Sequence, residues 1–264
     1  MVRADGRIER SRLARVMKRT VAGVGAAGAQ VRALIDAAGA GTLAERMDRV
    51  SARLLGRPYV ENPLGGGPGR PETLRVSLSG FDCVTYVETV LALARSRDSE
   101  EFLRTLRRIR YRGGRPAWST RNHYMTGWAR ENAARGLVHD LTLGPETAVR
   151  ERTLSMVPGI PARKARVRCF PKALLCRIGP RLATGDLVLF ASTRRRLDVF
   201  HVGLLVRTGA GLRLRHAARS AGRVVEQPLA EFAAARRMAG LIVLRPVDSR
   251  SARPRLRPAA KATA

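Results

Sequence analysis

The apolar residues of this chain change their spacing once, near residue 183, and that change is the strongest constraint on its fold. Upstream, apolar residues recur every three or four positions, as in Phe81, Val84, Val87 and Leu91, which is typical of helices. Downstream, the chain has short alternating or continuous apolar runs, which are typical of strands. Helices followed by an antiparallel sheet predict an α+β domain.

Helix boundaries can be read from local signals in the first half. Thr42 and Glu45 are spaced as a capping box, and Gly56 with Pro58 would end the helix that begins there. Between this helix and the next lies a loop rich in glycine and proline over residues 61–71, which we expect to be mobile. Further helices are predicted at 82–95, 99–109 and 123–135.

The strands define the second half and, with the helices, the domain limits. Gly209 and Gly211 suggest a hairpin turn between two of the strands. We predict an N-terminal extension at 1–41, a domain at 42–246 and a disordered basic tail at 247–264. Strands are predicted at 186–190, 199–206, 212–216, 223–226 and 240–244.

The formal net charge of +29 would normally indicate a nucleic-acid or membrane partner. Only four of the 50 basic residues are lysines, so 46 are arginines, and they are spread over the whole chain. This distribution favours a solvated basic surface over one dedicated nucleic-acid site. Such a surface would still attract anionic polymers non-specifically.

The N-terminus leaves two interpretations open. Residues 1–19 are rich in arginine and precede a weakly apolar stretch at 21–29, which resembles a signal peptide only loosely. A helical or flexible extension is the alternative. No run of about twenty apolar residues occurs, so no transmembrane span is predicted. The oligomeric state cannot be inferred from these features.

The three cysteines do not form a disulfide framework. Cys169 and Cys176 are too far apart for a zinc knuckle or a redox motif, and two small apolar residues are the simpler interpretation, although pairing stays open. Cys83 differs because it lies at the start of the 82–95 helix, which Ser79 or Asp82 could cap. Unpaired N–H groups there stabilise a thiolate and could hold a substrate oxyanion.

His201 and His216 complete a candidate catalytic group. His201 lies within a predicted strand, which fixes the direction of its imidazole. His216 ends the next strand, and side chains on one face of neighbouring strands stand about 5 Å apart. His216 can therefore hydrogen-bond His201 and set its tautomer. His123 is the competing base, and a zinc site of Cys83, His123 and His201 is a further alternative without closely spaced ligands.

These residues resemble a known family. Asp82-Cys83 at a helix start, His201 in a His-Val-Gly strand and then His216 are similar to the NlpC-type cysteine hydrolases, a permuted papain-like superfamily. The closer likeness is to the N-acetylmuramoyl-L-alanine amidase-like family, and it extends over residues 42–246. The motifs that carry it are Leu55–Tyr59, Phe81–Glu88, Ile109–Arg112, Arg121–Tyr124 with Trp128, Phe170–Lys172, Leu197-Asp198 and His216-Ala217.

The resemblance implies a papain-like fold, with N-terminal helices packed on a C-terminal antiparallel sheet or half-barrel. It also implies hydrolysis of the amide between muramic acid and L-alanine in peptidoglycan, preferentially in anhydro-muramoyl fragments, without metal or cofactor. The arginines would hold the stem-peptide carboxylates. The catalytic residues would be Cys83, His201 and His216. The candidate substrate contacts, each of which could instead be a cap or brace, are Tyr59, Asp82, Asn122, His123, Tyr124 and Lys172.

Two other functions remain open. A γ-D-glutamyl-diaminopimelate endopeptidase would use the same residues on another bond of the stem peptide. A non-catalytic module that binds cell wall or nucleic acid would use only the basic surface. The localisation stays open, with the periplasm or cell envelope slightly favoured over the cytoplasm.

Overall fold

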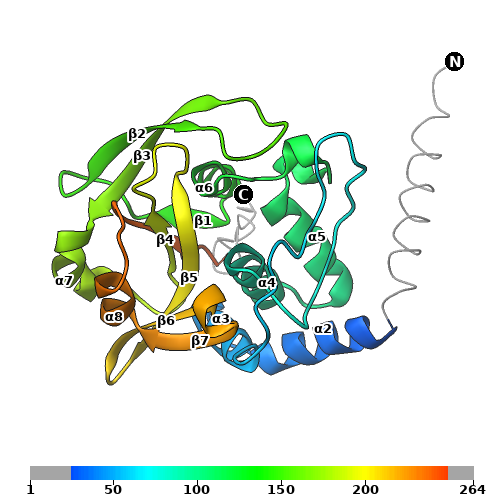
Figure 1. Cartoon of the computed structure of the whole chain (residues 1–264). Helices are drawn as coiled ribbons and strands as arrows, with labels where there is room; N and C mark the ends of the chain where they lie inside the picture. Colours follow the sequence, from blue (N-terminus) through cyan, green and yellow to red (C-terminus); the bar gives the residue numbers. More distant parts are fainter. Residues whose placement is uncertain (1–24, 249–264) are drawn as a thin grey trace, which may run out of the picture.

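The computed structural model describes residues 25–248, so the predictions for 1–24 and 249–264 lie outside the described residues. The chain forms the predicted α+β architecture, in which the N-terminal helices cover one face of an antiparallel sheet (Figure 1). The longer helices are α2 (Gly25–Ala38), α3 (Leu43–Arg53), α4 (Cys83–Arg95), α5 (Ser99–Arg110) and α6 (Met125–Ala134), and the shorter ones are α7 (Leu175–Ile178) and α8 (Leu229–Ala234).

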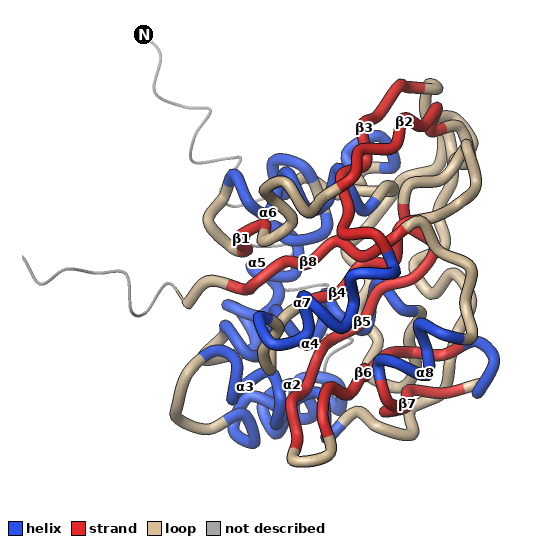
Figure 2. The backbone as a smooth tube through the Cα atoms, turned by 90° about the vertical axis from the view of Figure 1, so that its left-hand side faces the viewer, coloured by secondary structure: helices blue, strands red, loops and turns tan. Residues whose placement is uncertain are grey.

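The sheet is open and antiparallel, in the order β2-β3-β8-β4-β5-β6-β7, with β1 paired to β8. Its last five strands confirm the predicted ones, and β5 turns into β6 at the expected glycine hairpin. The β2–β3 hairpin, which the apolar pattern does not predict, extends beyond the rest of the sheet (Figure 2). The strands are β1 (Val138–Asp140), β2 (Ala148–Leu154), β3 (Arg163–Pro171), β4 (Leu187–Ala191), β5 (Val199–Thr208), β6 (Gly211–Ala218), β7 (Arg223–Pro228) and β8 (Gly240–Pro246).

The two faces of the sheet have separate apolar cores. Val202 and Leu204 of β5 pack in the core that α3, α4 and α5 share with the sheet. Leu205, on the opposite face, packs in a second core with α7 and α8. Both faces are covered, which explains why β4 is apolar along its whole length rather than alternating.

The helix starts follow the predicted caps. Thr42 and Glu45 form the capping box of α3. Of the two candidate caps for α4, Asp82 is the one used, and its carboxylate accepts hydrogen bonds from the N–H and the hydroxyl of Thr85. The start of α4, where Cys83 lies, is therefore fixed by three hydrogen bonds, because the Asp82 N–H also donates to the Thr85 hydroxyl.

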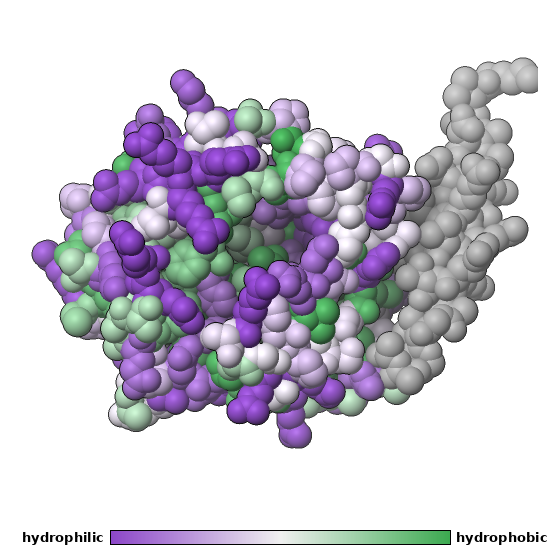
Figure 3. Space-filling view, in the orientation of Figure 1, coloured by the Kyte–Doolittle hydropathy of each residue, from purple (hydrophilic) through white to green (hydrophobic). Residues whose placement is uncertain are grey.

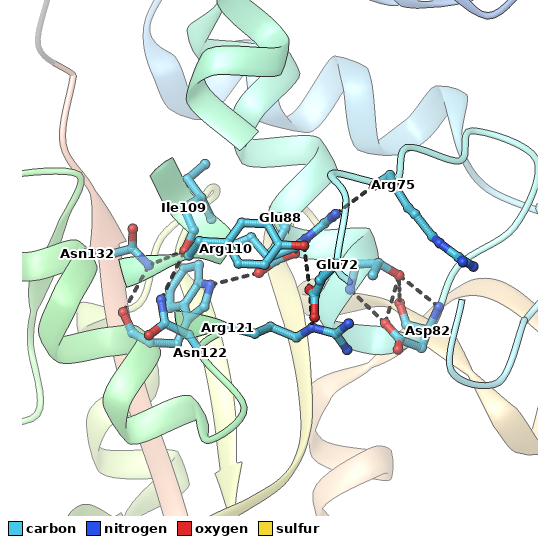
Figure 4. Close-up of polar contacts among 12 residues, drawn as sticks. Glu72, Arg75, Asp82, Glu88, Ile109, Arg110, Arg121, Asn122 and Asn132 are labelled. Carbon is cyan, nitrogen blue, oxygen red and sulfur yellow. Dashed lines mark hydrogen bonds and ion pairs between the residues drawn. The ribbon is translucent and has the colours of Figure 1, made fainter. Parts of the chain in front are cut away.

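A buried ion pair joins α4 to the end of α5 (Figure 4). Arg110 Nε lies 2.7 Å from Glu88 Oε2, and both side chains are at most 3 % exposed. The Trp128 indole donates to the second carboxylate oxygen of Glu88, and Arg110 also donates to the Arg75 carbonyl. Both oxygens of Glu88 are thus satisfied without water.

The loop at 61–71, expected to be mobile, is tied to the domain. Arg121 donates to the Gly65 carbonyl at 2.9 Å and pairs with Glu72 at 2.7 Å. The Tyr111 hydroxyl donates to the same Glu72 oxygen. Mobility was expected from the glycine content of the loop. The hydrogen bonds from outside the loop restrict that mobility.

Three further findings concern predictions on the rest of the chain. Part of the predicted 1–41 extension forms helix α2. This helix packs on the domain through Val31 and Ile35. Within residues 25–248, no helix is both long and apolar enough to cross a bilayer. Cys169 is buried, Cys176 is exposed, and the two do not form a disulfide.

Candidate active site

Cys83 is the first residue of α4 and is held against the sheet from two sides. The backbone of Phe81, two residues before Cys83, is fixed by two hydrogen bonds. Its N–H donates to the Pro58 carbonyl, and its carbonyl accepts from the Val60 N–H. Gly80 leaves no room for a side chain, since a Cβ there would lie 2.5 Å from Val60. The half-buried Cys83 thus leaves the loop in a fixed direction toward β5.

The sulfur of Cys83 lies against β5 next to His201. The backbone N–H of Val202, the residue that follows His201, lies close enough to the sulfur to favour its ionised form. The N–H groups of Cys83 and Val84 also face the sulfur and favour its ionised form. In the described residues no hydrogen bond directly joins this sulfur to the His201 ring, so the two groups are neighbours through the Val202 backbone.

His201 and His216 form a direct side-chain pair. Nε2 of His201 lies 2.6 Å from Nδ1 of His216, and the two rings stand at 87° with centroids 4.7 Å apart. Phe232 contacts both rings, at centroid distances of 5.3 Å and 5.2 Å. His216 is buried and His201 is partly exposed. The predicted neighbouring-strand contact is present, and it leaves Nδ1 of His201 as the nitrogen not engaged by His216.

Burial, more than the helix dipole, governs the protonation of this site. It raises the pKa of the Cys83 thiol to about 12, with the Asp82 carboxylate adding to the effect and the three N–H groups opposing it. Burial, then His216 and Arg236, lower the pKa of His201 to about 3. Burial and Arg236 lower the pKa of His216 to about 4. Burial therefore opposes the ionised thiol that the helix start by itself favours, and it favours the neutral form of both rings.

A cleft of about 1010 Å³ opens beside His201. Its floor includes the aromatic rings of Phe200 and Phe232, and its walls come from the β4–β5 connection, the segment after β6 and the end of α8. Figure 3 shows a hollow in this face of the molecule with hydrophilic side chains around its rim. Its basic lining residues are Arg194, Arg219, Arg236 and Arg237.

Comparison with known proteins identifies the family. The model of the N-acetylmuramoyl-L-alanine amidase-like family matches residues 49–240. The chain belongs to this family. No curated protein sequence matches it.

Solved structures of similar proteins share the fold of this amidase-like chain. A Legionella pneumophila protein superposes with a TM-score of 0.75 at 22% identity, over 84% of this chain and 94% of that one. An N-acetylmuramoyl-L-alanine amidase from Bacteroides uniformis superposes with a TM-score of 0.69 at 26% identity, over 78% of this chain and 99% of that one.

Of the candidate substrate contacts, Asp82 and Tyr59 lie next to Cys83. Burial and then the nearby Cys83 and Asp82 raise the pKa of the Tyr59 phenol, so it stays a neutral donor close to the sulfur. The Asp82 carboxylate is largely committed to capping α4. Tyr59 is therefore the freer of the two to contact a ligand.

Asn122, His123 and Tyr124 line a different pocket, of about 360 Å³, which shares no lining residue with the larger cleft. His123 Nε2 donates to the Trp118 carbonyl at 2.7 Å, and burial lowers the pKa of its ring. The Tyr124 hydroxyl accepts hydrogen bonds from the N–H groups of Met156 and Val157. Asn122 donates only weakly, at 3.4 Å, to a backbone carbonyl of α5. In this state the three residues brace neighbouring segments.

Lys172 lies outside both pockets. Its ammonium donates to the carbonyls of Ala234 and Arg236, which close the end of α8. Lys172 therefore holds the backbone that presents Arg236 to the cleft, and its side chain is not directed at a ligand.

Two residues of the site escape the sequence analysis. Arg236 acts on both imidazoles, but one arginine among 46 carries no signal. Gln227 lies 2.7 Å from Nε2 of His216. It could have been found, because His216 pairs with Val225 across β6 and β7, and residues two apart on a strand share a face.

Within residues 25–248, no group of three or more His, Cys, Asp or Glu side chains is arranged to hold a metal ion. His123, one of the three residues in the zinc alternative, lines the separate pocket. The described residues therefore offer no zinc site built from Cys83, His123 and His201.

The two histidines predict how stability depends on pH. Their pKa values are lower in the fold than the ordinary 6.5, so the unfolded chain binds more protons between about pH 6.5 and pH 4. The free energy of unfolding should therefore fall as the pH is lowered through this window. Replacing both residues with asparagine should flatten that fall, as measured by urea unfolding at several pH values. The exposed His139→Asn is the control, and an equal slope in the double variant would contradict the assignment.

Proposed function

We propose that this protein hydrolyses the amide between N-acetylmuramic acid, in its anhydro form, and L-alanine of the peptidoglycan stem peptide. Cys83 is the nucleophile and His201 the base. The observation that carries the proposal is the contact of the Cys83 sulfur with the Val202 backbone, beside an imidazole that His216 orients. Membership of the amidase-like family supports the choice of bond.

Acylation begins from neutral groups. His201 takes the thiol proton as the sulfur attacks the lactyl carbonyl carbon, because the unliganded thiol is not ionised. The N–H groups at the start of α4 stabilise the negative oxygen of the tetrahedral intermediate. The C–N bond then breaks, and His201 returns the proton to the departing amine of L-alanine, leaving a thioester on Cys83.

Deacylation uses the same two groups. His201 removes a proton from water, which attacks the thioester carbonyl. The C–S bond breaks, the muramic acid leaves as a carboxylic acid, and the proton returns to the Cys83 sulfur. No metal ion or cofactor enters these steps.

The cleft beside His201 supports an anionic peptide as the bound group. The stem peptide carries carboxylates, and arginine binds carboxylates through paired hydrogen bonds. Arg236 is well placed for this, since its guanidinium lies over Phe232, which contacts both histidine rings. Arg219 is already paired with Glu61 at 3.1 Å, at an exposed site.

Product analysis tests the proposed bond. Incubation with anhydro-muramoyl tetrapeptide should release an intact tetrapeptide and the free sugar acid, both identified by mass. A cut within the stem peptide would instead support the endopeptidase. An inactive protein that binds DNA or cell wall with a steep salt dependence would support the binding module.

Arg236→Gln should weaken substrate binding more than catalysis. Loss of a charge-assisted hydrogen bond of about 1.5–3 kcal/mol corresponds to a KM raised roughly 10- to 100-fold. A substrate whose stem carboxylates are converted to amides should show little difference between wild type and variant. Steady-state kinetics with both substrates measure this.

The matched control for Arg236 is Arg97→Gln, which removes the same charge at an exposed position beyond the far end of α4. It should leave KM unchanged, which separates local binding from the effect of net charge. An Arg236 variant with the wild-type KM for the carboxylate substrate would remove Arg236 from the binding site.

A further inference from the structure

A chain of three hydrogen-bonding side chains runs from the cleft across neighbouring strands to the edge of the sheet. His201 on β5 contacts His216 on β6 at 2.6 Å, and His216 contacts the amide of Gln227 on β7 at 2.7 Å. Each member comes from the next strand of the sheet. Gln227, partly buried on the edge strand β7, is therefore the far end of the chain, and His201 is the end that reaches the cleft.

The two rings are fixed in this arrangement by packing. Phe232 covers both of them. On β5, Gly203 lies beneath His216, and a Cβ at that position would be 2.5 Å from a Leu214 methyl and 3.1 Å from the His216 Cβ. The rings have little freedom to turn away. The property that can change is therefore which nitrogen of each ring carries the proton.

The orientation of the Gln227 amide determines which nitrogen of each ring carries a proton. When the amide nitrogen faces His216, Nε2 of His216 must accept and its Nδ1 carries the proton. That proton is donated to Nε2 of His201, and the neutral His201 ring then carries its proton on Nδ1. In this orientation, which the structure records, His201 has no free lone pair to act as a base.

A half-turn of the amide reverses the order. The amide oxygen then accepts from Nε2–H of His216, and Nδ1 of His216 accepts from Nε2–H of His201. Nδ1 of His201 is left with a free lone pair. Both states hold the same number of protons, because one proton leaves Nδ1 of His201 to water and one is taken up at Nε2 of His216.

We propose that Gln227 is a positioning residue whose amide oxygen, turned toward His216, makes Nδ1 of His201 the base that takes the Cys83 proton. This inference rests on the proposed function of Cys83 and His201. An uncharged amide suits the role, because it sets the tautomer of both rings without adding a charge. The charged group that acts on both rings is Arg236, at the end of α8.

Two substitutions separate the proton-directing role from a packing role. Gln227→Glu keeps the size and the acceptor and removes the donor, so it should keep kcat within about threefold of wild type. Its negative charge should also move the acid limb of the pH–rate profile upward. Gln227→Met keeps the size and removes both hydrogen-bonding atoms, so kcat should fall about 10- to 100-fold with KM little changed.

Nitrogen NMR of the imidazoles gives a readout that does not depend on activity. In Gln227→Glu both rings should carry their protons on Nε2, whereas Gln227→Met should show mixed tautomers. Gln30→Met, the same change on the exposed face of α2, should alter neither kinetics nor tautomers.

Wild-type kcat and tautomers in Gln227→Met would overturn the inference, as would an inactive, folded Gln227→Glu. Absence of hydrolysis by the wild type would instead overturn the proposed function. The tautomers of the two variants would then decide the inference alone.

Discussion

Cys83→Ala is expected to abolish hydrolysis of the muramoyl–alanine amide, with a fall in kcat of at least about 10³-fold. The sulfur is the only atom of this residue that can form the thioester, and no other described cysteine lies at the start of α4. The fold should survive, because the Asp82 cap and its three hydrogen bonds to Thr85 do not involve the thiol. The measurement is product formation by mass, with circular dichroism to monitor folding.

Two further variants sharpen the Cys83 test. Cys176→Ala removes an exposed thiol and should have wild-type activity. His201→Asn should lose activity as fully as Cys83→Ala, and the double variant should lose little more, because groups that act together are not additive. Hydrolysis that persists in folded Cys83→Ala would exclude the thioester mechanism.

Arg110→Met is expected to destabilise the fold by about 3–5 kcal/mol, because it leaves the Glu88 carboxylate buried without its cation. Burial already raises the pKa of Glu88, and Arg110 is the main group opposing that effect. In the variant the pKa should rise further. The destabilisation relative to wild type should therefore be small near pH 4, where Glu88 is protonated in both folded proteins, and grow as the pH rises above the pKa of Glu88 in the wild-type fold, which burial holds above the ordinary 4.5. Urea unfolding at pH 4 and pH 7 measures the loss of unfolding free energy and its dependence on pH.

The control for this pair lies on the same helix. Arg104 pairs with Glu100 at an exposed site on α5, and Arg104→Met should cost about 0.5 kcal/mol or less at either pH. Equal losses in the two variants would show that the buried pair contributes no more than a surface pair.

Because Glu88 is about one and a half turns from Cys83, Arg110→Met also tests whether α4 needs this ion pair to hold its sulfur in place.

The predictions of helix starts and strands were most accurate where local signals and burial agree. The starts of α3 and α4 follow from Thr42 and Asp82, whose side chains cap the helices by contacts three residues away. The strands from β4 onward follow from apolar runs that are buried in the fold. The β2–β3 hairpin was missed because β2 has polar residues at its centre and shows no apolar alternation. β3 does alternate, with Ala165, Val167 and Cys169 between exposed arginines, but this short pattern lies upstream of residue 183, where only helices were expected.

Within the site, the sequence identified His201 and His216 and their contact, because register on adjacent strands is a local property. It could not separate braces from ligand contacts. Lys172 and Tyr124 are polar residues in family motifs, yet one holds the end of α8 and the other holds the segment at Met156.

The sequence by itself determined helices α3 to α5, the strands from β4 onward, the cap that starts α4 and the pairing of the two histidines, since each depends on residues close together along the chain or on neighbouring strands. Only the tertiary structure decided the protonation of the site and the walls of the cleft. Burial depends on the whole fold, and it outweighs the helix dipole at Cys83. Arg236 reaches both rings because α8 folds back against β6 and β7, which no local pattern encodes.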